Sequence, residues 1–275
     1  MRLLNKVMIF FLSGVILAAC LGPIFLEHSP ETQNLSRRLE PPSQTYWLGT
    51  DSLGRDMTSR ILQGTRLSLL IGFSSTLIAL VIGTATGAIA GFLRGKTEAL
   101  ILGVIDFFGS FPTLLLAMLV SMATGKGLPG ILSSVALIAW LQHARLVRAQ
   151  VLQARQLEYV EAARALGLNP YRILWGHILP NIQGPILISA SAQIPSNMMA
   201  ESFLSFLGLG VQPPFASLGT LASEGSRLIT SHPHLIFAPG LTLFLTLLAS
   251  QYLGDSIRDY WAEGKHLGDR ESSED

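Results

Sequence analysis

The segment EYVEAARALGLNPYRILWGHILPN, residues 158–181, decides how the rest of the chain is interpreted. In its first half, small and apolar side chains recur at i, i+3, i+4 and i+7, the spacing that places residues on one face of a helix. The residues at this spacing are Tyr159, Ala162, Ala163 and Leu166. Gly167 can end such a helix in a left-handed conformation, and Pro170 suits the first turn of a second helix, which Pro180 limits. We therefore expect a short helix–turn–helix.

The apolar face of the first helix admits two interpretations. A helix of this kind can lie on a lipid surface, where bulky side chains anchor it. It can also dock into a groove of another protein, which small side chains allow to come close. Ala162 and Ala163 lie at the centre of this face, and their small size favours docking.

Outside this segment, the chain has the composition of a membrane protein. Of its 275 residues, 49% are hydrophobic and 13% are charged, against about 25% charged in an ordinary soluble domain. A helix needs about 20 predominantly apolar residues to cross a bilayer. Six long stretches have no Asp, Glu, Lys or Arg: residues 7–26, 67–93, 107–125, 127–144, 181–200 and 228–254. We therefore predict an all-α, polytopic membrane protein with about six transmembrane helices.

The first stretch also resembles a secretory signal. Arg2 and Lys6 precede an apolar run, and Leu17-Ala18-Ala19-Cys20 resembles a lipoprotein cleavage site. The apolar run continues past Cys20 to Leu26. We therefore expect an uncleaved first span, with a lipidated Cys20 as the alternative.

The distribution of Lys and Arg predicts the orientation. They are more frequent in the loops on the side of the N-terminus, which places both termini in the cytoplasm. The predicted divisions are residues 1–66 (first transmembrane helix and periplasmic loop), 67–256 (transmembrane core, with the helix–turn–helix loop at 150–180) and 257–275 (cytoplasmic tail).

The sequence of this loop also resembles a known family. Glu161-Ala162-Ala163, then Gly167, then Leu179-Pro180, are similar to the EAA loop of bacterial ABC-importer permeases. Three further stretches, residues 47–72, 201–214 and 253–261, resemble the dipeptide, oligopeptide and nickel branch. The first of these is typical of the second, C-type permease subunit of dipeptide importers.

The resemblance implies a type I importer permease with a cytoplasmic coupling helix, in the bacterial inner membrane. The residues that match the ATPase-docking motif are Tyr159, Glu161, Ala162, Ala163, Leu166 and Gly167. The implied partners are a second homologous permease, one or two ABC ATPase subunits, a substrate-binding protein and the lipid bilayer, with no nucleic acid. The implied function is to form half of a pore for peptides, or alternatively for nickel or another small solute. A self-contained secondary transporter is a further alternative from another class.

The chain itself shows no catalytic constellation and no metal-ligand spacing. We therefore predict a transport subunit that is not an enzyme and holds no cofactor or metal, with ATP bound by the partner ATPase. His232 and His234 are expected to be structural or solvated. Residues 90–97 fail the phosphate-loop pattern, because that pattern requires Gly where this chain has Ala90.

Two features inside the spans suggest further roles. The stretch 181–210 is unusually polar, and polar groups at membrane depth face a protein interior or a wet cavity. Its translocation-path candidates are Gln193, Asn197 and Glu201, with hydrogen bonding to other helices as the alternative. Gly83, Gly87 and Gly91 recur every four residues, a spacing that lets helices approach closely, so we predict that they pack against another helix.

Overall fold

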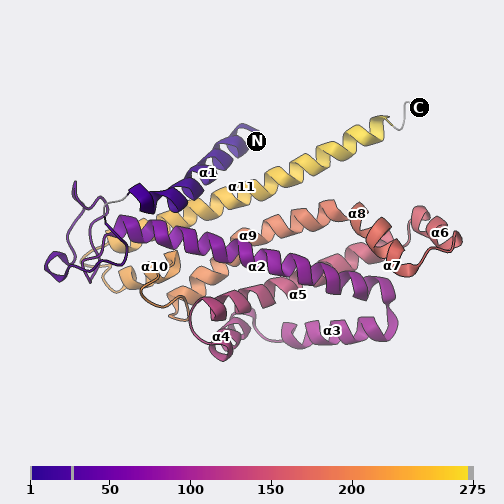
Figure 1. The fold of residues 1–275 in the computed structure, drawn as a ribbon, viewed down its shortest axis with the longest axis horizontal. Coiled ribbons are helices and arrows are strands. Elements are labelled where there is room, and N and C mark those ends of the chain that lie inside the picture. The colour runs from indigo at the N-terminus through magenta and orange to yellow at the C-terminus, as the bar shows by residue number, and fades with distance from the viewer. Residues whose placement is uncertain (1, 26–27, 272–275) are drawn as a thin grey trace. The chain divides into compact units, whose positions relative to one another are not determined.

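The computed structural model describes residues 2–25 and 28–271 (Figure 1). Within these residues there is no β-strand, apart from an isolated bridge between Thr50 and Asp56, so the all-α prediction is confirmed. The helices are α1 (Arg2–Phe25), α2 (Met57–Leu93), α3 (Gly95–Gly109), α4 (Thr113–Thr124), α5 (Leu128–Ala154), α6 (Glu158–Ala165), α7 (Pro170–Ile173), α8 (Leu179–Asn181), α9 (Gln183–Phe206), α10 (Leu218–Ser226) and α11 (His234–Glu271). A 3-10 turn, η1 (Leu35–Arg37), and a π-helical turn, η2 (Leu174–Ile178), complete the secondary structure.

Three of these helices are long and apolar enough to cross a membrane: α2, α5 and the part of α11 at His234–Asp259. The pair α3 and α4 forms a fourth candidate span, bent by 95°. The span predicted at residues 107–125 therefore differs in the structure, where it begins within α3 and is interrupted before α4. Pro112 lies at the break, where it cannot donate a backbone hydrogen bond and disfavours helical geometry in Phe111 before it.

The other two predicted spans correspond to α1 and α9, each a helix of 24 residues. Neither is among the long apolar helices of the described chain. The helix α9 carries many polar side chains, and in α1 the longest stretch whose side chains are all described is the apolar segment Phe10–Ala19. The side chain of Cys20 lies outside the described residues, as do residues 272–275 of the predicted tail.

The chain forms two compact units that interleave along the sequence. The first comprises Met1–Ser74, Ala117–Val135 and Ile194–Leu253, and the second comprises Ser75–Leu116, Ala136–Gln193 and Gly254–Asp275. One apolar core of the first unit surrounds Met57, Leu218 and Leu235. In the second unit, α6, α7 and η2 pack on α5 through a core that includes Val151, Val160 and Ile178.

In the first unit, the loop before α2 has an ordered conformation of its own. The carboxylate of Asp51 accepts hydrogen bonds from the backbone N–H groups of Leu53 (2.8 Å) and Arg55 (3.0 Å). Gly54 has φ +72°, and a β-carbon there would lie 1.8 Å from the carbonyl oxygen of Asn34, so only glycine fits. Asp56 accepts from the backbone N–H of Ser59 (3.0 Å), which caps α2 at Met57, ten residues before the predicted start of the span.

In the second unit, α3 runs beside α5 (Figure 1) and is joined to it by two ion pairs. Arg145 contacts Asp106 at 2.9 Å, and Arg148 contacts Glu98 at 2.5 Å. Glu98 lies in the first turn of α3 and Asp106 near its C-terminal end, so the two pairs join both ends of α3 to α5.

The glycines of α2 in this unit lie directly against α5. A β-carbon added at Gly83 would lie 3.0 Å from the Cβ of His143, and one added at Gly91 would lie 2.8 Å from the carbonyl oxygen of Arg148. At Gly87 it would lie 2.4 Å from the carbonyl oxygen of Ala144, closer than any real contact of this kind. The two helix backbones can approach this closely because all three positions lack a side chain.

Replacing Gly87 by alanine should therefore force α2 and α5 apart. We expect Gly87→Ala to destabilise the protein by about 1–3 kcal/mol, the usual range for overpacking a tight contact. Gly103→Ala is the matched control, because a β-carbon at Gly103 meets nothing within 4 Å. Thermal unfolding in detergent would measure both variants, and equal unfolding temperatures would show that the close contact does not matter.

Candidate functional site

The helix–turn–helix predicted at residues 158–181 begins with α6. Glu158 and Glu161 lie in the first turn of α6 and Arg164 in the last, so each charge complements the helix dipole. Two backbone N–H groups that follow the helix donate to carbonyl groups of its last turn. They are Gly167 N–H to Arg164 O (2.9 Å) and Leu168 N–H to Ala163 O (3.2 Å). This is a Schellman motif, and its left-handed residue is Gly167 at φ +74°.

The second arm of the motif begins at Asn169, whose side chain accepts from the Tyr171 N–H at 2.9 Å and caps α7. Pro170 occupies the first turn, as predicted. Helical structure then continues through η2 and α8 to Asn181, past the predicted limit at Pro180. Pro180 has no N–H, and the wider turn before it, in which Leu179 N–H bonds to Leu174 O, carries the helix past it.

The predicted docking face of α6 is divided by burial. Ala163 lies in the core of the second unit, and Tyr159 is half-buried against that core. Ala162 is exposed, and Leu166 is 81% exposed. The exposed members, together with the neighbouring Glu161, form what we call the α6 surface: Glu161, Ala162 and Leu166. The repeat of 3.6 residues explains the division, because it places Ala163 beside Val160, which the sequence analysis did not include and which is also buried.

The three translocation-path candidates all lie on α9 but in different surroundings. Gln193 belongs to the second unit and is half-buried, whereas Asn197 and Glu201 are buried in the first unit. Three serine hydroxyls donate to the Glu201 carboxylate, which is 0% exposed: Ser205 (2.7 Å), Ser68 (2.8 Å) and Ser202 (3.2 Å). The bond from Ser68 joins α9 to α2. For Glu201, this is the arrangement expected if its role is hydrogen bonding to another helix.

The first unit also holds a buried ion-pair cluster that the sequence analysis missed. Arg60, on α2, is 1% exposed and contacts Asp51 at 2.5 Å and Glu224 of α10 at 2.6 Å. Arg55 contacts the same Asp51 at 2.7 Å and Glu224 at 3.7 Å. The cluster therefore joins the loop before α2, α2 itself and α10.

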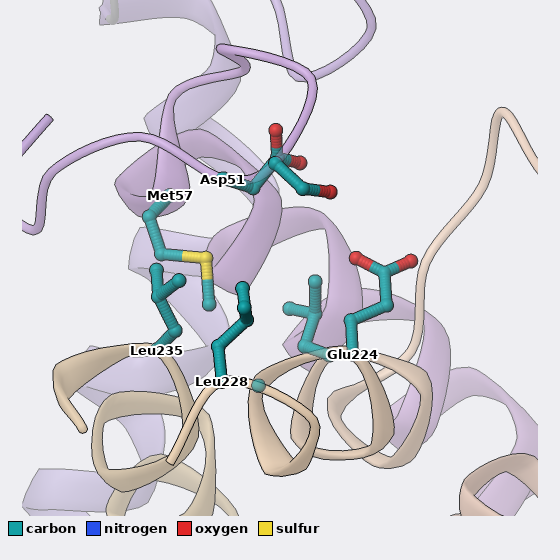
Figure 2. Close-up of a pocket in the computed structure, with 8 residues that line it drawn as sticks. Asp51, Met57, Glu224, Leu228 and Leu235 are labelled. Atoms are coloured by element: carbon teal, nitrogen blue, oxygen red, sulfur yellow. The ribbon is translucent and has the colours of Figure 1, made fainter. Parts of the chain in front are cut away.

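A small cavity of about 20 Å³, room for about one water molecule, lies beside this cluster. Figure 2 shows the carboxylates of Asp51 and Glu224 on one side of the cavity and the apolar side chains of Met57, Leu228 and Leu235 on the other. Both carboxylates are already neutralised by arginines. Across residues 2–25 and 28–271, no group of three or more His, Cys, Asp or Glu side chains is placed to hold a metal ion.

Part of this cluster could have been predicted. Asp51 and Arg55 are four residues apart in DSLGRD, a charged turn directly before an apolar helix. Glu224 could not have been assigned, because it lies 164 residues after Arg60 in the sequence and only the fold brings the two together.

The surroundings of Asp51 also change its pKa. Burial alone would raise the pKa of this carboxyl group. The backbone N–H of Arg55 and the charges of Arg60 and Arg55 outweigh that effect, so the pKa is lowered. The carboxyl group of Asp51 is therefore ionised at neutral pH.

Residues 83–262 match the sequence model of one family, described as the binding-protein-dependent transport system inner membrane component. The chain belongs to this family. The permease family was predicted from the EAA loop, and the prediction is confirmed.

Among relatives, this permease is similar to the oligopeptide transport system permease protein OppC of Bacillus subtilis, with 38% identity over 89% of this chain and 80% of the relative. It is 37% identical to the dipeptide transport system permease protein DppC of the same species, over 91% of this chain and 79% of the relative. It is also 42% identical to the glutathione transport system permease protein GsiD of Pectobacterium atrosepticum, over 80% of this chain and 73% of the relative.

The fold of the permease is similar to a chain of the MetNI methionine ABC transporter in an inward-facing conformation. The TM-score is 0.64 at 20% identity, and the match covers 74% of this chain and 97% of that chain. This likeness concerns the fold alone, and it confirms the predicted architecture of a type I importer permease.

We expect Arg60→Met to be strongly destabilising, because it leaves the buried Asp51 with one arginine fewer. Removing one partner of a buried ion pair costs about 3–5 kcal/mol. The control Arg38→Met removes an exposed arginine from the loop before α2 and should change stability by less than about 0.5 kcal/mol. Unfolding of the purified permease in detergent would compare the two, and equal losses would mean that the cluster does not stabilise the first unit.

The lowered pKa of Asp51 predicts how the loop responds to acid. A group whose pKa is depressed on folding stabilises the fold above its unfolded pKa, about 3.9, and loses that contribution as the pH falls through the folded pKa. Hydrogen-exchange protection of the Leu53 and Arg55 amides should therefore stay constant from neutral pH to about pH 4 and then fall. In Asp51→Asn this acid-dependent loss should be absent; its persistence would assign it to another group.

Proposed function

We propose that this permease forms half of the translocation pore of an ATP-driven importer of peptides. The observation that carries the proposal is the α6 surface, which presents the exposed apolar side chain of Leu166 at the end of a helix that a Schellman motif terminates. Peptides are proposed as the substrate because the similar relatives are named as oligopeptide, dipeptide and glutathione permeases. Nickel or another small solute remains the alternative substrate for the same machinery.

The α6 surface has the character of a docking site for a partner ATPase. Leu166 follows the last turn of α6, and the Schellman motif holds its backbone, so it can bind without first becoming ordered. Ala162 beside it allows a partner to approach closely, and Glu161 adds a charge at the rim. On the other side of α6, Val160 and Ala163 attach the helix to α5 and η2. A force applied at Leu166 is therefore transmitted to the membrane helices of the second unit.

The proposed topology and partner subunits follow from this docking role. Both termini lie in the cytoplasm, on the same side as α6. A second homologous permease completes the pore, one or two ATPase subunits bind below it, and a substrate-binding protein delivers the peptide from outside. ATP can shift the pore to its outward-open form only through a difference in affinity between the two forms, which the α6 contact would supply. Gln193 and Asn197 are the proposed path residues of α9, and Glu201 holds that helix in place.

Introducing a charge on the α6 surface tests the proposal. We expect Leu166→Asp to lower the affinity of the permease for the ATPase by about 30-fold or more, because loss of a central apolar contact in an interface costs about 2 kcal/mol or more. The loss would be measured by co-purification of the ATPase with the permease. ATP-driven peptide uptake into proteoliposomes should fall with it, while membrane insertion stays intact.

The control is Leu35→Asp, which makes the same change at an exposed leucine in the loop before α2. Leu35 is 64% exposed, compared with 81% for Leu166. It should leave ATPase binding unchanged. Normal ATPase binding and uptake by Leu166→Asp would contradict the docking role, and uptake by the permease alone without ATP would favour a secondary transporter.

A further inference from the structure

A second and larger cavity lies in the first unit, apart from the ion-pair cluster. Its volume is about 360 Å³, within the range of about 300–1,000 Å³ typical of small-molecule sites. It is partly open, and it is bordered by Leu67 of α2, by the turn between α4 and α5, and by the segment that follows α9. The residues that line it are Leu67, Lys126, Gly127, Leu128, Val211, Gln212, Pro213, Pro214 and Phe215.

The chemistry of this cavity is that of an apolar pocket with one positive charge. Leu67, Val211 and Phe215 supply apolar walls, and Lys126 is the one charged residue among the described residues that line it. Within residues 2–25 and 28–271, Lys126 forms no ion pair or hydrogen bond, so its three donors can take a ligand. The positive end of the α5 dipole lies at the same wall, because α5 begins at Leu128.

We infer that this cavity binds the C-terminal residue of a peptide, with its carboxylate on Lys126 and its side chain against Leu67, Val211 and Phe215. The inference rests on the proposed peptide-import function. Every unmodified peptide ends in a carboxylate whatever its sequence, so one ammonium group serves peptides of many sequences. Apolar contact is not directional, so the walls accept different side chains.

The same features decide which end of a peptide binds. No Asp or Glu is among the described lining residues, so nothing there pairs with the ammonium group at the N-terminus of a peptide. Lys126 pairs with the carboxylate, and Gln212, whose amide N–H donates to the Gly210 carbonyl at 2.9 Å, keeps its own carbonyl oxygen for the last peptide N–H. The cavity therefore orients a peptide with its C-terminus inward.

The test measures protection of a cysteine placed in the wall. Phe215→Cys is made in a Cys20→Ser background of the full transporter, purified into phosphatidylcholine nanodiscs, and alkylated with a maleimide. The probes are the tripeptide alanyl-alanyl-phenylalanine and its C-terminal amide. The free acid should protect the introduced thiol at about fivefold lower concentration than the amide, the size expected for an exposed ion pair. A Thr45→Cys reporter, on an exposed position outside the cavity, should be protected by neither.

Two variants separate charge from shape. In Lys126→Met, which removes the charge but keeps an unbranched side chain of nearly the same length, the free acid should lose its advantage and protect no better than the amide. In Lys126→Arg, which keeps the charge, the advantage should remain. Equal protection by acid and amide in the parent, or an unchanged advantage in Lys126→Met, would overturn the inference.

A lipid headgroup is the competing occupant of this cavity. If nanodiscs containing phosphatidylglycerol protect the thiol of the Phe215→Cys variant without peptide, and Lys126→Met abolishes that protection, the cavity binds a lipid headgroup and the inference is wrong. If the tripeptide is taken up into proteoliposomes but does not protect that thiol, the inference that this cavity binds peptides is wrong and the proposed import function stands. Absence of ATP-driven uptake for any peptide would overturn the proposed function itself.

Discussion

Lipid offers no hydrogen bonds to a peptide backbone, and this constraint governs the whole structure. Each N–H and C=O group at membrane depth must be satisfied within the chain, which makes helices obligatory for a sequence as apolar as this one. Close packing of those helices then depends on small residues, because apolar side chains gain little by leaving lipid for one another. Gly83, Gly87 and Gly91 meet that need by letting α2 lie directly against the backbone of α5.

Buried polar side chains also need partners within the chain, inside or outside the membrane, and the two units supply them in different ways. In the first unit, Arg60 is buried between the carboxylates of Asp51 and Glu224, and Glu201 accepts from three serine hydroxyls. In the second unit, the ion pairs from α3 to α5 are more exposed. Burial makes the first kind of contact intolerant of losing one partner, so these residues hold particular elements together.

The two proposed sites of this permease lie where the fold leaves side chains exposed. The α6 surface lies on a helix that its own buried face attaches to α5 and η2, so it suits a contact that must transmit force. The cavity at Lys126 combines apolar walls with an ammonium group, so it suits an anionic group on an apolar body. At each site an exposed side chain, Leu166 or Lys126, is left available to a partner or ligand.

The sequence by itself determined the class of the protein. Long uncharged stretches required a helical membrane protein, and the motif of Glu161, Ala162, Ala163 and Gly167 identified the permease family, because these patterns depend on residues close together in the chain. The tertiary structure decided what depends on distant residues. It divided the predicted docking face by burying Ala163, bent the span predicted at residues 107–125, and paired Arg60 with Glu224. Helical periodicity shows that residues share a face, but only packing shows which part of that face is covered.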